Sequence, residues 1–174
     1  MIPERKNDPL VICGFPGIGK TRFAQYMNER EGRTDILDLD SKPFKAVDSE
    51  HPNMYCREIE KAYQSKDYSY ILVSCHKKVR EYMQEHGINY IIVMPEIQEN
   101  IDIMRATRNE YMKRYLSRGD SVKFMKKIYD NWYKWMKEMF EDDPAPKIQI
   151  HKRLYIEDIF EDLYILPDVK EQES

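Results

Sequence analysis

Short runs of apolar residues recur along the chain and alternate with longer stretches in which apolar and charged residues are mixed. Runs of this kind are typical of buried strands, whereas apolar residues spaced three or four apart indicate helices. We therefore predict five strands, at residues 10–13, 34–41, 68–76, 88–95 and 147–150. Because the strands are continuous apolar runs, they favour a parallel sheet that is covered on both faces.

Helices are predicted between these strands, at about residues 21–27, 55–64, 77–87, 97–117, 121–140 and 155–166. Gly87 is expected to be the C-cap of the 77–87 helix and Ser121 the N-cap of the 121–140 helix, and a break within 97–117 is left open. The remaining segments are expected to be a polar loop that contains two prolines (42–55), a turn (141–146) and a frayed tail (167–174).

The alternation of strands and helices predicts an α/β fold with three layers and a parallel sheet of about five strands. Neither an internal repeat nor a linker divides the sequence, so we predict one domain over residues 1–174, with a helical lid at about 97–140. Ligands of open parallel sheets bind outside the carboxyl ends of the strands, and functional residues are therefore sought there.

The segment GFPGIGKT, residues 14–21, directly follows the first predicted strand and leads into the first predicted helix. It matches G-x-x-x-x-G-K-[ST], in which backbone N–H groups surround phosphates, the lysine reaches the β- and γ-phosphates and the hydroxyl binds Mg²⁺. A strand, a loop and a helix in this order predict a P-loop NTPase fold that binds ATP and Mg²⁺. The residues expected to bind the nucleotide are Gly14, Pro16, Gly17, Ile18, Gly19, Lys20, Thr21 and Arg22.

Two acids, Asp38 and Asp40, lie at the end of the second predicted strand. Residues i and i+2 of a strand share a face, so both carboxylates are expected to point into the same crevice. One carboxylate would hold Mg²⁺, directly or through water, and the other would orient or deprotonate an acceptor hydroxyl. Solvation of a loop or capping of a helix is the alternative for this pair.

The third predicted strand ends in Ser74, Cys75 and His76, without the Walker-B aspartate that is usual in hydrolytic P-loop proteins. This difference disfavours an NTPase switch and assigns the metal to Thr21, Asp38 and Asp40. Contacts of Ser74 and His76 with a substrate, and purely structural roles for them, both stay open.

Arg114 and Arg118 are four residues apart and therefore lie on one helix face. Paired arginines of a lid can close over phosphates and stabilise the charge of a transferred phosphoryl group. A solvated basic face is the alternative, and Lys113 beside them favours it. Arg105 and Arg108 are weaker candidates for the same role.

The 174 residues include 28 Lys and Arg and 31 Asp and Glu, for a formal net charge of −3. The net charge therefore does not favour nucleic acid as a ligand. A DNA substrate would need a local band of basic residues across the mouth of the site. The three cysteines show no disulfide or metal-binding spacing, and no apolar run approaches the length of a membrane span. These features predict a cytoplasmic location and no membrane contact, and they leave the oligomeric state open.

From residue 10 to about residue 160, the chain resembles a group of small P-loop kinases that are common in phages and bacteria. The group includes the phage 5-hydroxymethyluracil DNA kinases and proteins described as nucleoside or nucleotide kinases. The resemblance rests on the P-loop, DLDS at 38–41, ILVSCHKKVREYM at 71–83 and NEYMKRYLSRGDSVKFMKKIYDNWYKWM at 109–136. Its most specific parts are the serine–cysteine–histidine strand end and KRYLSRG at 113–119. More distantly, the chain resembles the 5′-kinase domain of polynucleotide kinases and the shikimate kinases.

The resemblance implies that Gly17, Gly19, Lys20 and Thr21 bind ATP and Mg²⁺, that Asp38 and Asp40 serve the metal and the acceptor hydroxyl, and that Arg114 and Arg118 form a lid. It supports a kinase far better than any one acceptor, because the group covers several. The segment 44–58 occupies the acceptor-binding position of small kinases. Its residues suit a nucleobase, a phosphate or an ordinary surface helix, and they are Phe44, Asn53, Tyr55 and Arg57.

We therefore predict a Mg²⁺-ATP-dependent phosphotransferase that moves the γ-phosphate to a hydroxyl or phosphate of a nucleoside, a nucleotide or a modified DNA base. Two alternatives remain, a nucleotide-binding switch without an acceptor and a P-loop protein with a structural role. Trp132 and Trp135 have the spacing of helix packing, which is favoured over stacking on adenine.

Overall fold

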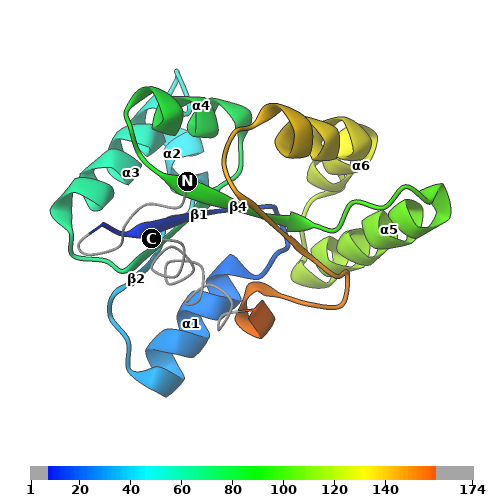
Figure 1. Cartoon of the computed structure of the whole chain (residues 1–174), viewed down its shortest axis with the longest axis horizontal. Helices are drawn as coiled ribbons and strands as arrows, with labels where there is room; N and C mark the ends of the chain where they lie inside the picture. Colours follow the sequence, from blue (N-terminus) through cyan, green and yellow to red (C-terminus); the bar gives the residue numbers. More distant parts are fainter. Residues whose placement is uncertain (1–7, 160–174) are drawn as a thin grey trace, which may run out of the picture.

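A five-stranded parallel sheet forms the centre of the computed structural model, which describes residues 8–159. The strands are β1 (Leu10–Gly14), β2 (Ile36–Asp38), β3 (Tyr70–Ser74), β4 (Tyr90–Pro95) and β5 (Lys147–Ile150). Their order in space is β2-β3-β1-β4-β5 (Figure 1), so β1 is central and β2 and β5 are the two edges. The predicted α/β fold with five parallel strands is confirmed.

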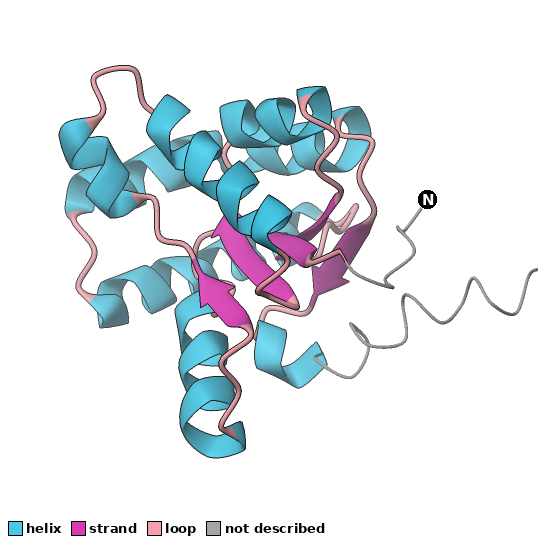
Figure 2. Cartoon of the chain, turned by 90° about the vertical axis from the view of Figure 1, so that its left-hand side faces the viewer, coloured by secondary structure: helices cyan, strands magenta, loops and turns pink. Residues whose placement is uncertain are grey.

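Six α-helices connect the strands (Figure 2), namely α1 (Lys20–Glu31), α2 (Lys42–Val47), α3 (Asn53–Ser65), α4 (Lys77–Glu85), α5 (Ile101–Arg118) and α6 (Val122–Lys137). Helix α1 lies on one face of the sheet, and α3 and α4 lie on the other (Figure 1). Both faces of the central strands are therefore covered, which explains why β1 and β4 are apolar throughout and completely buried.

The register of the central strands places their carboxyl ends together. Gly14, the last residue of β1, pairs with Ser74 of β3 and with Val93 of β4. Residues that follow β1 and β3 therefore emerge side by side at one edge of the sheet, where ligands of parallel sheets bind.

The prediction of a loop at residues 42–55 is wrong, because this segment contains α2 and the first turn of α3. The Asp40 carboxylate accepts a hydrogen bond from the backbone N–H of Lys42 at 3.0 Å. Pro43 lies in the first turn of α2, where the missing N–H of proline leaves no hydrogen bond unmade. Pro43, one of the two prolines that suggested a loop, thus lies where a helix begins.

The segment that was predicted to form a lid, residues 97–140, contains two continuous helices. Helix α5 is unbroken, and the side chain of Asn100 caps its N-terminus. Ser121 caps α6, as predicted, by accepting a hydrogen bond from the N–H of Phe124. Helix α6 then continues into a π-helical turn, Glu138–Asp142. A cluster of aromatic rings, Phe15, Tyr111 and Trp132, packs both helices against the P-loop.

Other boundaries differ slightly from the predictions. Strand β2 is limited to Ile36–Asp38, and α4 ends at Glu85, so that Gly87, with a φ of 66°, follows the C-cap residue His86. Of the predicted 155–166 helix, the structure describes a 3-10 turn at Ile156–Ile159, and the rest lies outside the described residues, as does the 167–174 tail. Within residues 8–159, no helix is long and apolar enough to cross a membrane.

Candidate functional site

A cavity of about 870 Å³ opens at the carboxyl ends of β1, β2 and β3. We call it the main cavity. Its walls come from the P-loop, the segment after β2, helix α5 and the segment after β5. Its lining residues are Gly14, Pro16, Gly17, Gly19, Lys20, Thr21, Arg22, Asp38, Leu39, Asp40, Ser41, Lys42, Lys45, Ser74, Glu110, Lys113, Arg114, Ser117, Arg118, Phe124, Lys152, Arg153 and Tyr155.

The backbone of the P-loop packs closely against neighbouring side chains. Gly17 and Gly19 have φ values of 83° and 97°, a conformation that favours glycine. A Cβ atom at Gly17 would lie 2.8 Å from the ring of Tyr115, and one at Gly19 would lie 2.9 Å from Tyr155. Tyr115 also donates a 2.6 Å hydrogen bond to the carbonyl of Pro16. Both glycines are therefore required by backbone shape and by close packing.

Lys20 lies over the loop, with its amine donating to the Gly14 carbonyl at 2.8 Å. Burial lowers the pKa of this amine from its usual value, Cys75 and Asp38 oppose the lowering, and Arg118 adds to it. A bound phosphate would stabilise the charged amine and raise its pKa again. Of the residues predicted to bind the nucleotide, Ile18 alone does not line the main cavity, because its side chain is buried; its carbonyl accepts from the N–H of Ile156.

The two acids occupy different positions in the main cavity. The Thr21 hydroxyl donates a 2.7 Å hydrogen bond to the Asp38 carboxylate at the end of β2. Asp40 lies beyond the strand and is exposed, and one of its oxygens caps Lys42 at the start of α2. Both carboxylates line the main cavity, but only Asp38 contacts the P-loop.

Arg114 makes the most contacts of the predicted arginines. Its guanidinium donates to the carbonyls of Gly17 at 2.8 Å, Lys152 at 2.6 Å and Leu154 at 3.0 Å. It also lies 4.0 Å from the ring centroid of Tyr155. Arg114 therefore ties the P-loop to the segment after β5.

Arg118, by contrast, is exposed and bonded to a nearby side chain. It donates to the Asp120 carboxylate at 2.7 Å and lies 5.3 Å from the ring centroid of Tyr115. Arg22 is similar, because it pairs with Glu157 at 2.8 Å while its side chain remains 62% exposed. Surface pairs of this kind are weak and can open. The weaker candidates, Arg105 and Arg108, do not line the main cavity.

Tyr55 joins the ends of β2 and β3. Its hydroxyl donates to the Leu39 carbonyl at 2.6 Å and accepts from the N–H of Ser74 at 3.0 Å. Tyr55 is fully buried, so the predicted acceptor-side aromatic residue supports the floor of the main cavity instead of lining it. Ser74 lines that cavity, whereas His76, at the start of α4, does not.

Arg80 hydrogen-bonds to Cys75, the residue that follows β3. Its side chain is buried and donates to the Cys75 carbonyl at 2.9 Å, to Asp143 at 2.6 Å and to Glu138 at 2.8 Å. This network could not be predicted from the sequence, because Asp143 and Glu138 lie far from Arg80 in the chain. Burial raises the pKa of the Cys13 and Cys75 thiols, which keeps these cysteines protonated.

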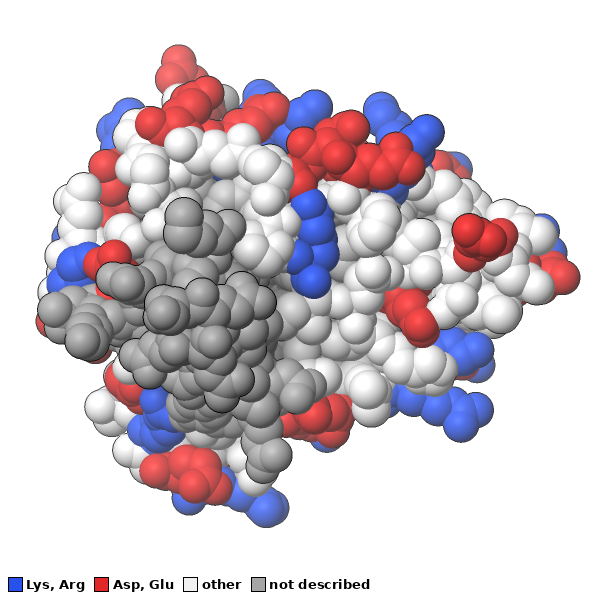
Figure 3. Space-filling model, in the orientation of Figure 1, with Lys and Arg blue, Asp and Glu red and all other residues white. Residues whose placement is uncertain are grey.

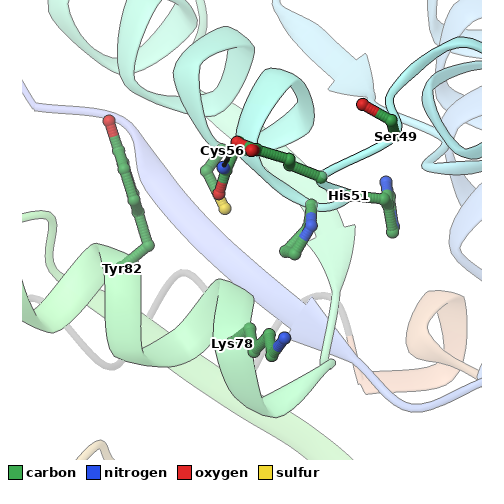
Figure 4. Close-up of a pocket in the computed structure, with 8 residues that line it drawn as sticks. Ser49, His51, Cys56, Lys78 and Tyr82 are labelled. Atoms are coloured by element: carbon green, nitrogen blue, oxygen red, sulfur yellow. Dashed lines mark hydrogen bonds between the residues drawn. The ribbon is translucent and has the colours of Figure 1, made fainter.

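A second cavity, of about 380 Å³, lies between the start of α3 and α4. Figure 4 shows Lys78 and Tyr82, from α4, on one side, and Ser49, His51 and Cys56 on the other. Tyr55 lies near both cavities, because its ring is 6.4 Å from that of His51 and its hydroxyl binds the floor of the main cavity.

The oxygen ligands near the P-loop suit Mg²⁺. Thr21 and Asp38 supply a hydroxyl and a carboxylate, the hard oxygen ligands that Mg²⁺ prefers. Within the described part of the chain, no group of three or more His, Cys, Asp or Glu side chains could hold a metal by itself. Mg²⁺ typically binds to one or two protein ligands together with substrate phosphates, so two ligands fit it.

No family model matches the sequence. The chain is 24% identical over 140 residues to a shikimate kinase of Bacillus licheniformis. The matched region covers 80% of this chain and 69% of that protein. The similarity is distant, and it agrees with the parallel α/β fold. The predicted resemblance to phage kinases and to polynucleotide kinases stays a prediction.

Proposed function

We propose that the protein is a Mg²⁺-ATP-dependent phosphotransferase of the P-loop kinase type. Its acceptor would be a hydroxyl or phosphate of a nucleoside, a nucleotide or a modified DNA base. The hydrogen bond between Thr21 and Asp38 at the mouth of the P-loop carries this proposal, because it joins the two oxygen ligands beside the Lys20 amine. The distant similarity to a shikimate kinase supports it.

In this proposal, ATP supplies the phosphoryl group and Mg²⁺ neutralises the charge of its phosphates. The P-loop backbone and Lys20 bind the β- and γ-phosphates, and Thr21 and Asp38 hold the metal ion. Hydrogen bonds from Tyr115 and Arg114 to carbonyls of the loop support this assignment, because they fix the loop backbone. Catalysis would come mainly from this positioning and from electrostatics.

Asp40 is assigned to the acceptor. Its carboxylate lines the main cavity and is exposed, and it bonds only to the backbone N–H of Lys42 among the described residues. Free lone pairs remain on it to orient an acceptor hydroxyl. They would take its proton as the acceptor oxygen bonds to the γ-phosphorus and the bond from that phosphorus to the β–γ bridging oxygen breaks, with ADP as the leaving group. Arg118 is assigned to the transferred group, because its surface pair with Asp120 can exchange for a phosphate.

A panel of acceptors tests the proposal. ADP release from Mg²⁺-ATP would be measured with nucleosides, nucleoside monophosphates, 5′-hydroxyl oligonucleotides, DNA that contains hydroxymethyluracil, and shikimate. We expect release that rises with one class of acceptor and disappears in the Lys20→Ala variant. Release at one rate with every acceptor, and with none, would instead indicate a hydrolytic switch. Circular dichroism of the variant would check that its fold is intact.

A further inference from the structure

The main cavity is strongly basic although the chain as a whole is acidic. Nine of its lining residues are Lys or Arg and three are Asp or Glu, whereas the formal net charge of the chain is −3. On the face shown in Figure 3, by comparison, acidic and basic side chains of the described residues are interspersed around the rim. The positive charge is therefore concentrated at the site itself. The nine cations are Lys20, Arg22, Lys42, Lys45, Lys113, Arg114, Arg118, Lys152 and Arg153.

Among the described residues, four of these cations make no hydrogen bond or ion pair through their side chains. Three others pair with carboxylates, Arg22 with Glu157, Lys113 with Glu110 and Arg118 with Asp120. Lys20 and Arg114 donate to backbone carbonyls. Within residues 8–159, no hydrogen bond or ion pair engages the side chains of the remaining four, which are Lys42, Lys45, Lys152 and Arg153.

The four unpartnered cations come from opposite edges of the sheet. Lys42 and Lys45 follow edge strand β2, and Lys152 and Arg153 follow edge strand β5, with the P-loop between them after β1. The segment after β5 is bonded to the P-loop through Arg114, so its cations belong to the nucleotide side. Lys42 and Lys45 lie instead beyond Asp38 and Asp40, on the acceptor side.

Positive charge continues outward from Lys45. Burial lowers the pKa of His76, and Lys127 and Lys45 lower it further, as do His51 and Lys78. His51 and Lys78 line the second cavity, opposite one another (Figure 4). Glu50 is the one acid among the lining residues of that cavity. Basic groups therefore extend from the main cavity to the second cavity.

We propose that the phosphoryl acceptor carries phosphate groups of its own, and that Lys42 and Lys45 bind them. This inference rests on the proposed function, because the acceptor side is defined by Asp38 and Asp40. Like charges held together without counter-ions repel one another, and a phosphate removes that repulsion while it gains charge-assisted hydrogen bonds. A neutral nucleoside would leave both lysines unpaired. A mononucleotide and a nucleic-acid strand share the required chemistry.

Binding measurements test the inference without catalysis. The probes are thymidine, thymidine 5′-monophosphate and single-stranded octathymidylate, each titrated by calorimetry into the whole protein across a salt series. The test variant is Lys42→Gln with Lys45→Gln, and both side chains are exposed, so the fold should not change. Lys61→Gln is the matched control, because Lys61 is an exposed lysine of α3 that lines neither cavity.

We expect the double variant to bind the phosphate-bearing probes about tenfold or more weakly, with ATP affinity changed less than about twofold. For octathymidylate, loss of two phosphate contacts should reduce the salt slope by roughly 1.4, at about 0.7 for each contact with a single strand. The control should bind like the wild type. Unchanged affinity of the double variant for both phosphate-bearing probes, or an equal loss for ATP, would overturn the inference.

The same titrations identify the source of the phosphate. Octathymidylate that binds more tightly than thymidine 5′-monophosphate, with a steeper salt dependence, would indicate a strand, and equal affinities would indicate a mononucleotide. Either result supports the inference, whereas thymidine binding as tightly as its monophosphate contradicts it. Failure of the proposed function is distinguishable, because phosphate-bearing ligands would then bind through Lys42 and Lys45 without acceptor-dependent ADP release.

Discussion

The hydroxyl of Thr21 donates a 2.7 Å hydrogen bond to the carboxylate of Asp38, the last residue of edge strand β2. The two residues are 17 positions apart in the chain, and the strand order β2-β3-β1 brings them together. The bond links the first turn of α1, directly after the glycine-rich loop, to the last residue of β2. It defines the point at which nucleotide, metal ion and acceptor would meet.

Replacement of Asp38 should separate metal binding from folding. Asp38→Asn retains an oxygen that can accept from Thr21 but removes the charge that is proposed to hold Mg²⁺. We expect turnover at saturating ATP to fall by about a hundredfold or more, with a higher Mg²⁺ requirement. Turnover measured as a function of Mg²⁺ concentration checks this, and an unchanged Mg²⁺ dependence would contradict the metal role.

Asp40→Asn is the matched variant for the second acid. Asparagine can still cap Lys42, so the start of α2 should be preserved. We expect a lower turnover with nearly unchanged ATP affinity and Mg²⁺ dependence, because Asp40 is assigned to the acceptor hydroxyl. Equal losses of turnover and ATP affinity would indicate a binding role for Asp40 instead.

The two arginines of α5 should respond differently to substitution. Arg114→Ala leaves three carbonyls without their donor, so we expect the free energy of unfolding to fall by about 1–3 kcal/mol. Arg118→Ala removes a surface ion pair, so stability should change by less than about 1 kcal/mol while turnover falls. Urea unfolding together with steady-state kinetics measures both effects. Equal stability losses would show that the two arginines have the same structural role.

Tyr55→Phe tests the support beneath the main cavity. The variant removes the hydroxyl that joins the Leu39 carbonyl to the N–H of Ser74, and it keeps the buried ring. We expect the free energy of unfolding to decrease by about 1–3 kcal/mol, since both backbone groups lose a partner. Urea unfolding measures this change. A Tyr63→Phe variant, at another buried tyrosine of α3, is the control for loss of a hydroxyl alone.

Stability should decrease in mild acid because of His51 and His76. In the folded protein the pKa of each lies below the ordinary value of 6.5, chiefly because of burial, with Lys45 adding to the lowering in both. The unfolded chain therefore binds more protons below pH 6.5, so stability falls as the pH drops from 6.5 toward the folded pKa values and is unaffected above 6.5.

Urea unfolding of the wild type and of His76→Gln, at about pH 7.5 and about pH 5.5, measures this effect. The variant should lose less stability between the two pH values than the wild type. An equal loss in both proteins would mean that His76 does not contribute to the acid sensitivity. His86, an exposed histidine of the described chain, provides the control variant His86→Gln.

Much of the fold could be predicted because its signals are local. Continuous apolar runs identify β1, β3 and β4, and the spacing of Gly14, Gly19, Lys20 and Thr21 identifies the P-loop. Helix α2 was missed because Pro43 and polar neighbours suggest a loop, although proline fits the first turn of a helix.

The positive charge of the main cavity could not be predicted, because it depends on the order of the strands in the sheet. Lys42 and Lys152 lie more than a hundred positions apart in the sequence, and the sheet places them on opposite sides of one cavity. The net charge of the chain gave no sign of this basic cavity. The position of Arg114 on a helix face was predicted, but its three backbone partners are set by tertiary packing.

Transfer of label from γ-³²P-ATP tests the central proposal most directly. The wild type and Lys20→Ala would be incubated with Mg²⁺ and the acceptor that most increases ADP release, and the products separated. We expect label on the acceptor with the wild type and none with the variant. Label that appears only as inorganic phosphate, or transfer that persists in Lys20→Ala, would contradict it.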